Sequence, residues 1–225
     1  SRQMCIRDRN IVIHMRLLTS LSELRLTAKT PHGEVPYWSK VSTVSAKDIL
    51  SYCNKKYFDN LCQVGCPNYS SKWSCPPYSP AYKDFSKNYQ KLCVVLLGLD
   101  MSSLDYIKQD YLKIKAANSI LKSRIDKVLR ACKDDDEKYI STGSCRLCKP
   151  CHKKLNEPCA HPDIRTFSYE ALGVNVSSMV HDIFGIDLLW YAKGSLPLYT
   201  CVVAGLLSNQ MMLDDRIIAK IKEFR

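Results

Sequence analysis

The side chains of this chain best suited to chemistry are its cysteines, of which there are twelve in 225 residues. One run has three cysteines at intervals of three positions and a fourth eight positions later; its members are Cys145, Cys148, Cys151 and Cys159. Each thiolate of a four-iron cluster binds a different iron, so one tight turn supplies three ligands and a more distant cysteine supplies the last. We therefore predict that this run holds a 4Fe-4S iron–sulfur cluster.

Zinc is the alternative metal for this run. A single tetrahedral zinc is usually held by two separated pairs of ligands, and a third cysteine so close to a pair would crowd the ion. The fourth position is also unusual for a cluster, because bacterial ferredoxin runs place it four residues after the third. The first three cysteines thus carry the prediction, and Cys159 joins them only if the intervening residues fold back. For His161 we expect a supporting or structural role rather than metal ligation.

A second cysteine group lies earlier in the chain. It consists of Cys62, Cys66 and Cys75, the last two each followed by a proline, which stiffens a loop. Three thiolates leave one iron of a cluster open, or they recruit a fourth ligand from elsewhere. Cys53 is a candidate for that ligand, but its place on an apolar helix face favours a core role. Core roles are also expected for the cysteines in other apolar segments, which are Cys93, Cys132 and Cys201.

These cysteines need a scaffold, and the apolar pattern predicts its first elements. Residues 93–99 form a continuous apolar run with β-branched members, typical of a strand buried on both faces. Residues 103–132 keep a three-to-four spacing of apolar positions, which indicates a long helix. Prolines and a glycine interrupt any long element between residues 15 and 45. A short helix capped by Ser45 is expected from Ala46, with an apolar face made of Ile49, Leu50, Cys53 and Tyr57.

The second half of the chain predicts further short helices. The acidic run Asp134–Glu137 is expected to be a solvated exit from the long helix. Ser168 and Glu170 should open a short helix that stops at Gly173. For Glu170 a capping role is expected, and a chemical part beside the second cysteine loop is the alternative. A further helical piece is predicted to reach Gly185.

The last part of the chain completes an α+β fold. Residues 187–192 and 198–207 read as the two strands of a hairpin, and an amphipathic helix beginning with Asp214 and Asp215 follows them. We therefore expect a small mixed sheet backed by helices. Two cysteine-rich metal-binding loops, at residues 62–80 and 143–162, project from this scaffold.

The length of the chain is enough to bury one core, and we expect residues 15–225 to form a single metal-binding domain. Residues 1–14 are expected to be an artefactual or disordered N-terminus that lacks helical or strand periodicity, so Cys5 is set aside. No export signal is visible, and no apolar run reaches the ~20 residues that span a bilayer. A protein of a reducing compartment, the cytoplasm, is the expectation, without a membrane partner.

The formal net charge of +11 would ordinarily suggest an acidic partner or a nucleic acid. Metal-bound thiolates are anionic, however, and would remove much of that excess. The basic residues are dispersed, and no helix-turn-helix, zinc-finger or RNA-stacking pattern accompanies them, so nucleic-acid binding is not expected. Lysines beside the second loop could meet an acidic redox partner or form a solvated surface; they are Lys149, Lys153 and Lys154. The oligomeric state stays open.

Five motifs in order give the chain a family resemblance. They are Cys66-Pro67-Asn68-Tyr69, Trp73-Ser74-Cys75-Pro76-Pro77-Tyr78, Cys145-Arg146-Leu147-Cys148-Lys149-Pro150-Cys151, Pro158-Cys159-Ala160-His161-Pro162 and Ser168-Tyr169-Glu170-Ala171-Leu172-Gly173-Val174. They resemble the cysteine-rich predicted metal-binding protein family, domain of unknown function 2284, over residues 45–207. The resemblance implies an iron–sulfur type of metal-binding protein, common in anaerobes, without an agreed reaction. The chain departs from the family pattern at positions that are not proposed ligands, namely Ala160, Tyr169 and Asn175.

Three functions follow from these observations. The first is electron transfer or a redox accessory role, in which one or two clusters pass electrons to a redox partner protein. The second is an enzyme or carrier of anaerobic one-carbon or cofactor metabolism, where the open iron of the three-cysteine group binds a substrate. The third is a zinc-stabilised interaction module. No serine–histidine–aspartate order, glycine-rich phosphate loop or pair of catalytic carboxylates can be assigned, so conventional acid–base catalysis is unsupported.

Overall fold

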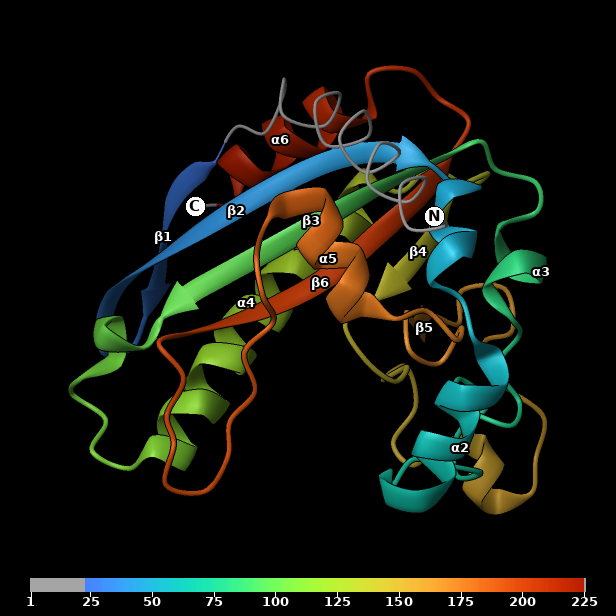
Figure 1. The fold of residues 1–225 in the computed structure, drawn as a ribbon, viewed down its shortest axis with the longest axis horizontal. Helices are drawn as coiled ribbons and strands as arrows, with labels where there is room; N and C mark the ends of the chain where they lie inside the picture. The colour runs from blue at the N-terminus through green and yellow to red at the C-terminus, as the bar shows by residue number, and fades with distance from the viewer. Residues whose placement is uncertain (1–22, 225) are drawn as a thin grey trace, which may run out of the picture.

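A computed structural model describes residues 23–224 of the chain (Figure 1). Its centre is a six-stranded sheet in the order β1-β2-β3-β6-β4-β5. The strands are β1 Leu24–Thr30, β2 Gly33–Ser45, β3 Lys91–Asp100, β4 Lys138–Ser141, β5 Phe167–Ser168 and β6 Tyr199–Ser208. All neighbouring pairs are antiparallel except β4 and β5, which are parallel. The predicted α+β class with a mixed sheet is therefore confirmed.

Helices cover both faces of this sheet. They are η1 Asp48–Tyr52, α2 Lys55–Gly65, α3 Tyr82–Ser86, η2 Met101–Leu104, α4 Asp110–Cys132, η3 His152–Leu155, α5 Val176–Phe184 and α6 Leu213–Glu223. Helices α4 and α6 lie on one face and α5 lies on the other (Figure 1). Within the described residues, none of these helices has the length and apolar character needed to cross a membrane.

The central strand β3 is buried on both faces, as its continuous apolar run predicts. Val95 and Leu97 belong to a core cluster that includes the buried sides of α4 and α6. Val94 and Leu96 belong to a second cluster, with α5 and the segment 167–174. Because successive side chains of a strand point to opposite faces, one apolar strand joins the two cores.

Several predicted elements are confirmed, with one change of boundary. The long helix ends at Cys132 as predicted, but α4 begins only at Asp110, because η2 and a short connection precede it. Helix α5 ends at Gly185, which has φ 67°, the left-handed conformation that favours glycine at a helix end. Helix α6 carries Asp214 and Asp215 in its first turn, where acidic side chains favour the helix dipole.

The prediction of no long element between residues 15 and 45 is wrong for the described part, because β1 and β2 form a long hairpin. Gly33 begins β2 with φ 114°, a conformation that glycine adopts without strain. Pro36 pairs with Thr27, whereas the pairing of β2 with β3 begins at Trp38. The missing amide hydrogen of Pro36 therefore removes no bond to β3. The expectations for residues 1–14, including Cys5, lie outside the described residues.

The helix expected from Ala46 is broken into η1 and α2. The break lies at Asn54, whose amide donates to the carbonyl of Gly173 at 2.8 Å and whose side chain caps α2. Leu50 and Tyr57, expected on a buried face, are exposed. Helix α2 then continues through Cys62, so the first cysteine segment begins within a helix and not at the start of a loop.

Three further expectations are corrected. No helix spans residues 168–173; the short strand β5 ends there, and turns closed by Gly173, with φ 86°, follow. Residues 187–192 are not a strand, because Ala192 and Ser195 form only an isolated bridge, although β6 confirms the second predicted strand. Glu137 is 2% exposed and ion-paired to Arg216, so the acidic run is not entirely solvated.

Candidate metal centre

The first two cysteines of the N-terminal group are positioned by the end of α2. The Asn54 side chain accepts a hydrogen bond from the Tyr57 amide at 3.1 Å and fixes the start of this helix. Cys62 lies in its last turn, and Cys66 follows at its C-terminal cap, where the Cys66 amide donates to the Cys62 carbonyl at 3.0 Å. Positions four apart lie on the same side of a helix, so both thiols are presented together.

The third cysteine of this group is held by a chain of tight turns. The amide of Cys75 donates to the Lys72 carbonyl at 3.1 Å, and the Ser70 amide donates to the Pro76 carbonyl at 2.8 Å. Ser70 has a left-handed φ of 52°. These bonds fold the segment back on itself, so that Cys75, which is buried, approaches the end of α2.

The thiols of this group act on one another electrostatically. Burial, together with the charges of Cys66, Cys75, Asp59 and Glu170, raises the pKa of Cys62 to about 11. Burial likewise raises the pKa of Cys75, while the Ser74 hydroxyl and the Lys72 ammonium oppose that shift. A bound metal would act in the reverse direction, since it stabilises the thiolate form.

The C-terminal group is also brought together. Desolvation raises the pKa of Cys148, and the charges of Cys151, Cys145 and Cys159 add to the shift in that order. The charges of the other three predicted members therefore reach Cys148, and their assignment as ligands of one cluster stays a prediction. The short helix η3 and Asn156, with a left-handed φ of 58°, make the return turn.

The two cysteine groups adjoin each other, which the spacing alone did not predict. The Cys145 amide donates to the Ser74 hydroxyl at 3.1 Å, and the Trp73 ring nitrogen donates to the Glu157 carbonyl at 2.9 Å. The charge of Cys151 also raises the pKa of Cys75. Figure 1 shows the consequence, because α2 and the C-terminal cysteine segment lie side by side away from the sheet.

Lys72 supplies a positive charge between the two groups. Its ammonium donates to the Ser144 hydroxyl at 2.9 Å and to the Cys145 carbonyl at 3.4 Å. It also lowers the pKa of Cys75. No sequence signal singled out this lysine, because its contacts are with residues more than seventy positions away.

An aromatic pair covers the junction of the two segments. The rings of Trp73 and Tyr78 meet edge to face, with their centroids 4.9 Å apart. The Lys153 ammonium lies over both rings, 5.1 Å from the Trp73 centroid and 4.8 Å from the Tyr78 centroid. Lys153 is thus engaged with aromatic faces of the other segment, and it is not simply a solvated lysine.

Glu170 approaches the three-cysteine group from a third segment. Its charge raises the pKa of both Cys62 and Lys122, as the smallest of the contributions to each shift. The expected capping role is not observed, because residues 168–173 form turns and not a helix.

The remaining described cysteines lie apart from these two groups. Cys93 and Cys132 are buried in the first core cluster, as expected. Cys201 and Cys53 are partly buried against the second cluster, and the Cys53 thiol donates to the Ile49 carbonyl at 3.4 Å. None of the eleven described cysteines is part of a disulfide.

The fit to a metal rests on the donor set. Within residues 23–224, no three or more histidine, cysteine, aspartate or glutamate side chains converge as a single ion would require. The donors present are the four thiols of the C-terminal group and the three of the adjoining N-terminal group, with Lys72 between the two segments. Soft thiolates in this number suit zinc or iron–sulfur centres. His161 is exposed and the structure gives it no ligand role.

The fold and this site define the chain as a cysteine-rich α+β protein of a metal-binding class. A family model described as predicted metal-binding protein, domain of unknown function 2284, matches residues 44–204. The chain belongs to this family, and the resemblance of its five motifs is confirmed. No curated protein and no solved structure matches the chain.

Proposed function

We propose that this protein binds one or two 4Fe-4S iron–sulfur clusters and acts in electron transfer or as a redox accessory protein. The observation that carries the proposal is the adjacency of the two cysteine groups, which the bond from the Cys145 amide to the Ser74 hydroxyl fastens together. Such clusters supply one-electron redox chemistry when bound. Two centres held side by side suit the passage of electrons from one to the other.

The chain's own residues would have distinct tasks in this role. Cys145, Cys148, Cys151 and Cys159 would hold one cluster, and Cys62, Cys66 and Cys75 would hold the other. Lys72 would offset the negative charge of the thiolates on both sides. Trp73 and Tyr78, with Lys153 above them, would limit the access of water to the junction, and exclusion of water tunes the potential of such centres.

A redox partner with an acidic surface is the occupant we propose for the exposed side of α2. This helix has no buried residue, and Tyr57, Leu61 and Val64 are 53%, 51% and 90% exposed at helical spacing. The exposed Lys149 and Lys154 of the adjoining cysteine segment provide positive charge nearby. Complementary charge steers a partner toward such a face. We place this reaction in the cytoplasm, where thiols stay reduced.

A second candidate function rests on Glu170. The charge of this carboxylate acts on Cys62 of the three-cysteine group, where an iron would lack a fourth thiolate. An open iron there would bind a substrate as a Lewis acid, as in an enzyme or carrier of anaerobic one-carbon or cofactor metabolism. Replacing Glu170 by glutamine separates the two functions. An altered electron paramagnetic resonance spectrum of the N-terminal centre supports this candidate, and an unchanged spectrum supports electron transfer alone.

Single replacements of cysteine test the assignment. In protein purified without oxygen, Cys148→Ser should remove the signal of one reduced cluster and leave the other, and Cys62→Ser should do the converse. Cys201→Ser is the matched control, since Cys201 belongs to neither group, and it should change neither signal. Identical spectra for all three variants and the wild type would show that the ligands are assigned wrongly.

A further inference from the structure

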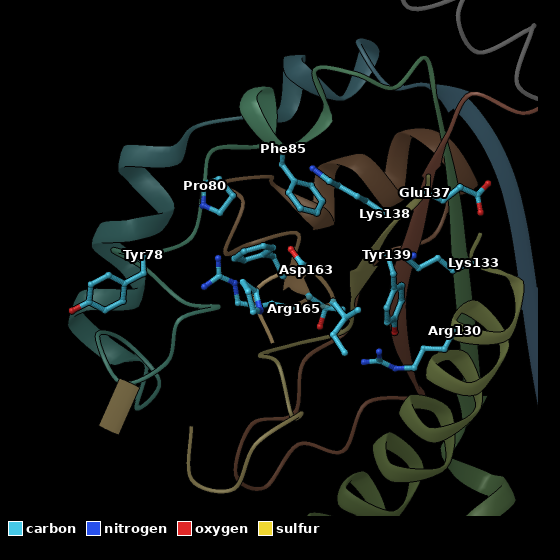
Figure 2. A pocket seen from close by; sticks show the side chains of 14 residues that line it. Tyr78, Pro80, Phe85, Arg130, Lys133, Glu137, Lys138, Tyr139, Asp163 and Arg165 are labelled. Atoms are coloured by element: carbon cyan, nitrogen blue, oxygen red, sulfur yellow. The ribbon is translucent and has the colours of Figure 1, made fainter. Parts of the chain in front are cut away.

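A hollow of about 690 Å³ opens where β4, the end of α4 and residues 162–167 meet (Figure 2). Its volume is within the ~300–1,000 Å³ of sites that hold small molecules. The rings of Phe85, Tyr139 and Phe167 line it, and each of these residues is at most 9% exposed. Rings fixed in this way provide a rigid apolar surface on which a flat ligand can pack.

The lining of this hollow carries an excess of positive charge. Four of its residues are cationic, namely Arg130, Lys133, Lys138 and Arg165, and two are acidic. One of the acids, Glu137, is already neutralised, because its carboxylate is paired to Arg216 at 2.5 Å and accepts from the Asp134 amide at 2.9 Å. The remaining acid, Asp163, is exposed, and Arg130 is paired to Asp126 at 2.9 Å, so three cations of the lining are left to one acid.

Three of the cations, Lys133, Lys138 and Arg165, have no acidic side-chain partner among the described residues. The Lys138 ammonium lies over the Phe85 ring, 4.7 Å from its centroid, and the Arg165 guanidinium lies over the Phe167 ring at 5.1 Å. The Nε atom of Arg165 is buried and has no hydrogen-bond partner within the described part of the chain. A buried donor without an acceptor is energetically costly. A ligand that brings an acceptor oxygen to this Nε–H group would therefore be stabilised.

The arrangement of these side chains places charge around a flat surface. Figure 2 shows Lys138 beside Phe85 in the upper part of the view, Arg130 beside Tyr139 at the right, and Arg165 to the left of both pairs. An arginine fork matches the two oxygens of a carboxylate or phosphate. The aromatic rings below would take the body of the same molecule.

A second hollow extends the positive surface. Its volume is about 340 Å³, and it shares Arg130 and Thr166 with the first. Lys122 and Arg146 line it together with hydroxyl side chains. Burial and the charge of Arg146 lower the pKa of Lys122, and the charge of Glu170 opposes that shift.

We propose that the larger hollow binds a small molecule that carries a carboxylate or phosphate group on a planar ring. This site does not depend on the proposed redox function. It lies beside the metal centre, however, since Tyr78 and Pro80 follow Cys75 closely in the chain and also line the hollow, as do Pro162 and Asp163. A ligand bound there would therefore contact the ends of both cysteine segments.

The test is calorimetric titration of the full chain, purified without oxygen, with three probes: benzoate, phenyl phosphate and the neutral benzyl alcohol. One of the two aromatic anions should bind saturably, and benzyl alcohol should bind at least about tenfold more weakly, because it lacks the charge-assisted bonds. The tighter of the two anions identifies the group as carboxylate or phosphate. No saturable binding of either anion would overturn the proposal.

Variants locate the binding. Arg165→Gln and Lys138→Gln should each lower the affinity for the aromatic anion about tenfold. Lys193→Gln makes the same charge change at an exposed position outside the hollow and should have no effect. Unaltered affinity in both hollow variants, or an equal loss in Lys193→Gln, would refute the site. Far-UV circular dichroism and iron content, measured on each sample, separate lost ligand binding from misfolding or lost metal.

Discussion

Replacing Gly173 by alanine should loosen the attachment of α2 to the rest of the domain. Gly173 has φ 86°, and a Cβ placed there would lie 2.6 Å from the Cα of Lys55, the first residue of α2. The clash is with backbone, so no change of side-chain rotamer relieves it. The Gly173 carbonyl also accepts the Asn54 amide at 2.8 Å, which is the bond that positions the start of this helix.

The expected loss can be divided into two parts. A left-handed backbone costs an alanine about 1–2 kcal/mol, and an unrelieved overlap costs about 1–3 kcal/mol more. Gly173→Ala should therefore lower the free energy of unfolding by about 2–5 kcal/mol. Gly194 provides the matched control, because it has φ 82° but nothing within 4 Å of the added Cβ. Gly194→Ala should therefore lose only the part of the free energy of unfolding that comes from the left-handed backbone.

Urea denaturation followed by circular dichroism measures both variants, and metal analysis shows where the loss acts. Because α2 carries Cys62 and leads to Cys66, the metal content of the N-terminal group should fall more than that of the C-terminal group in Gly173→Ala. Equal destabilisation by the two glycine variants, with unchanged metal content, would refute the account of how α2 is anchored.

Three further predictions concern single side chains. Ser74→Ala removes the acceptor of the Cys145 amide, so it should lower the free energy of unfolding by about 0.5–1.5 kcal/mol. The variant should also lose its metal to a chelator faster than the wild type, and equal rates of metal loss would contradict the prediction. Burial raises the pKa of Cys201 from its ordinary value of 9.0 to about 12. Between these values the folded chain keeps a proton that the unfolded chain releases, so stability should fall as pH rises above 9. Urea titrations at several pH values should show a shallower fall for Cys201→Ala. Glu137→Gln weakens the buried ion pair with Arg216 and should lower the free energy of unfolding, measured by urea titration, by about 1–3 kcal/mol. An unchanged unfolding midpoint would show that the pair does not stabilise the fold.

Elements with a strong apolar pattern were predictable from the sequence. The strand β3 is continuously apolar because it is buried in both cores, and α4 keeps apolar positions at helical spacing because one of its sides packs into the first core. The hairpin of β1 and β2 was not predictable, because Pro36 normally opposes a strand. The pairing of β2 with β3 starts only at Trp38, so the missing amide hydrogen of that proline removes no hydrogen bond to β3.

The sequence indicates which cysteines belong to each group, but it does not indicate that the two groups lie next to each other. The spacing of Cys145, Cys148 and Cys151 points to a metal by local geometry alone. The contacts that unite the two groups, from Lys72 and Ser74, join segments about seventy residues apart. Such contacts depend on tertiary packing, for which a single sequence has no local signal. The sequence pattern around Glu170 likewise indicates a helix cap, because the turns that the tertiary fold forms there have no local signal.

The most direct test of the central claim is the metal and sulfide content of the full chain purified without oxygen. Iron–sulfur binding predicts about four irons for each intact cluster with a matching amount of acid-labile sulfide. Stoichiometric zinc without sulfide would contradict it and would identify a zinc-stabilised module instead.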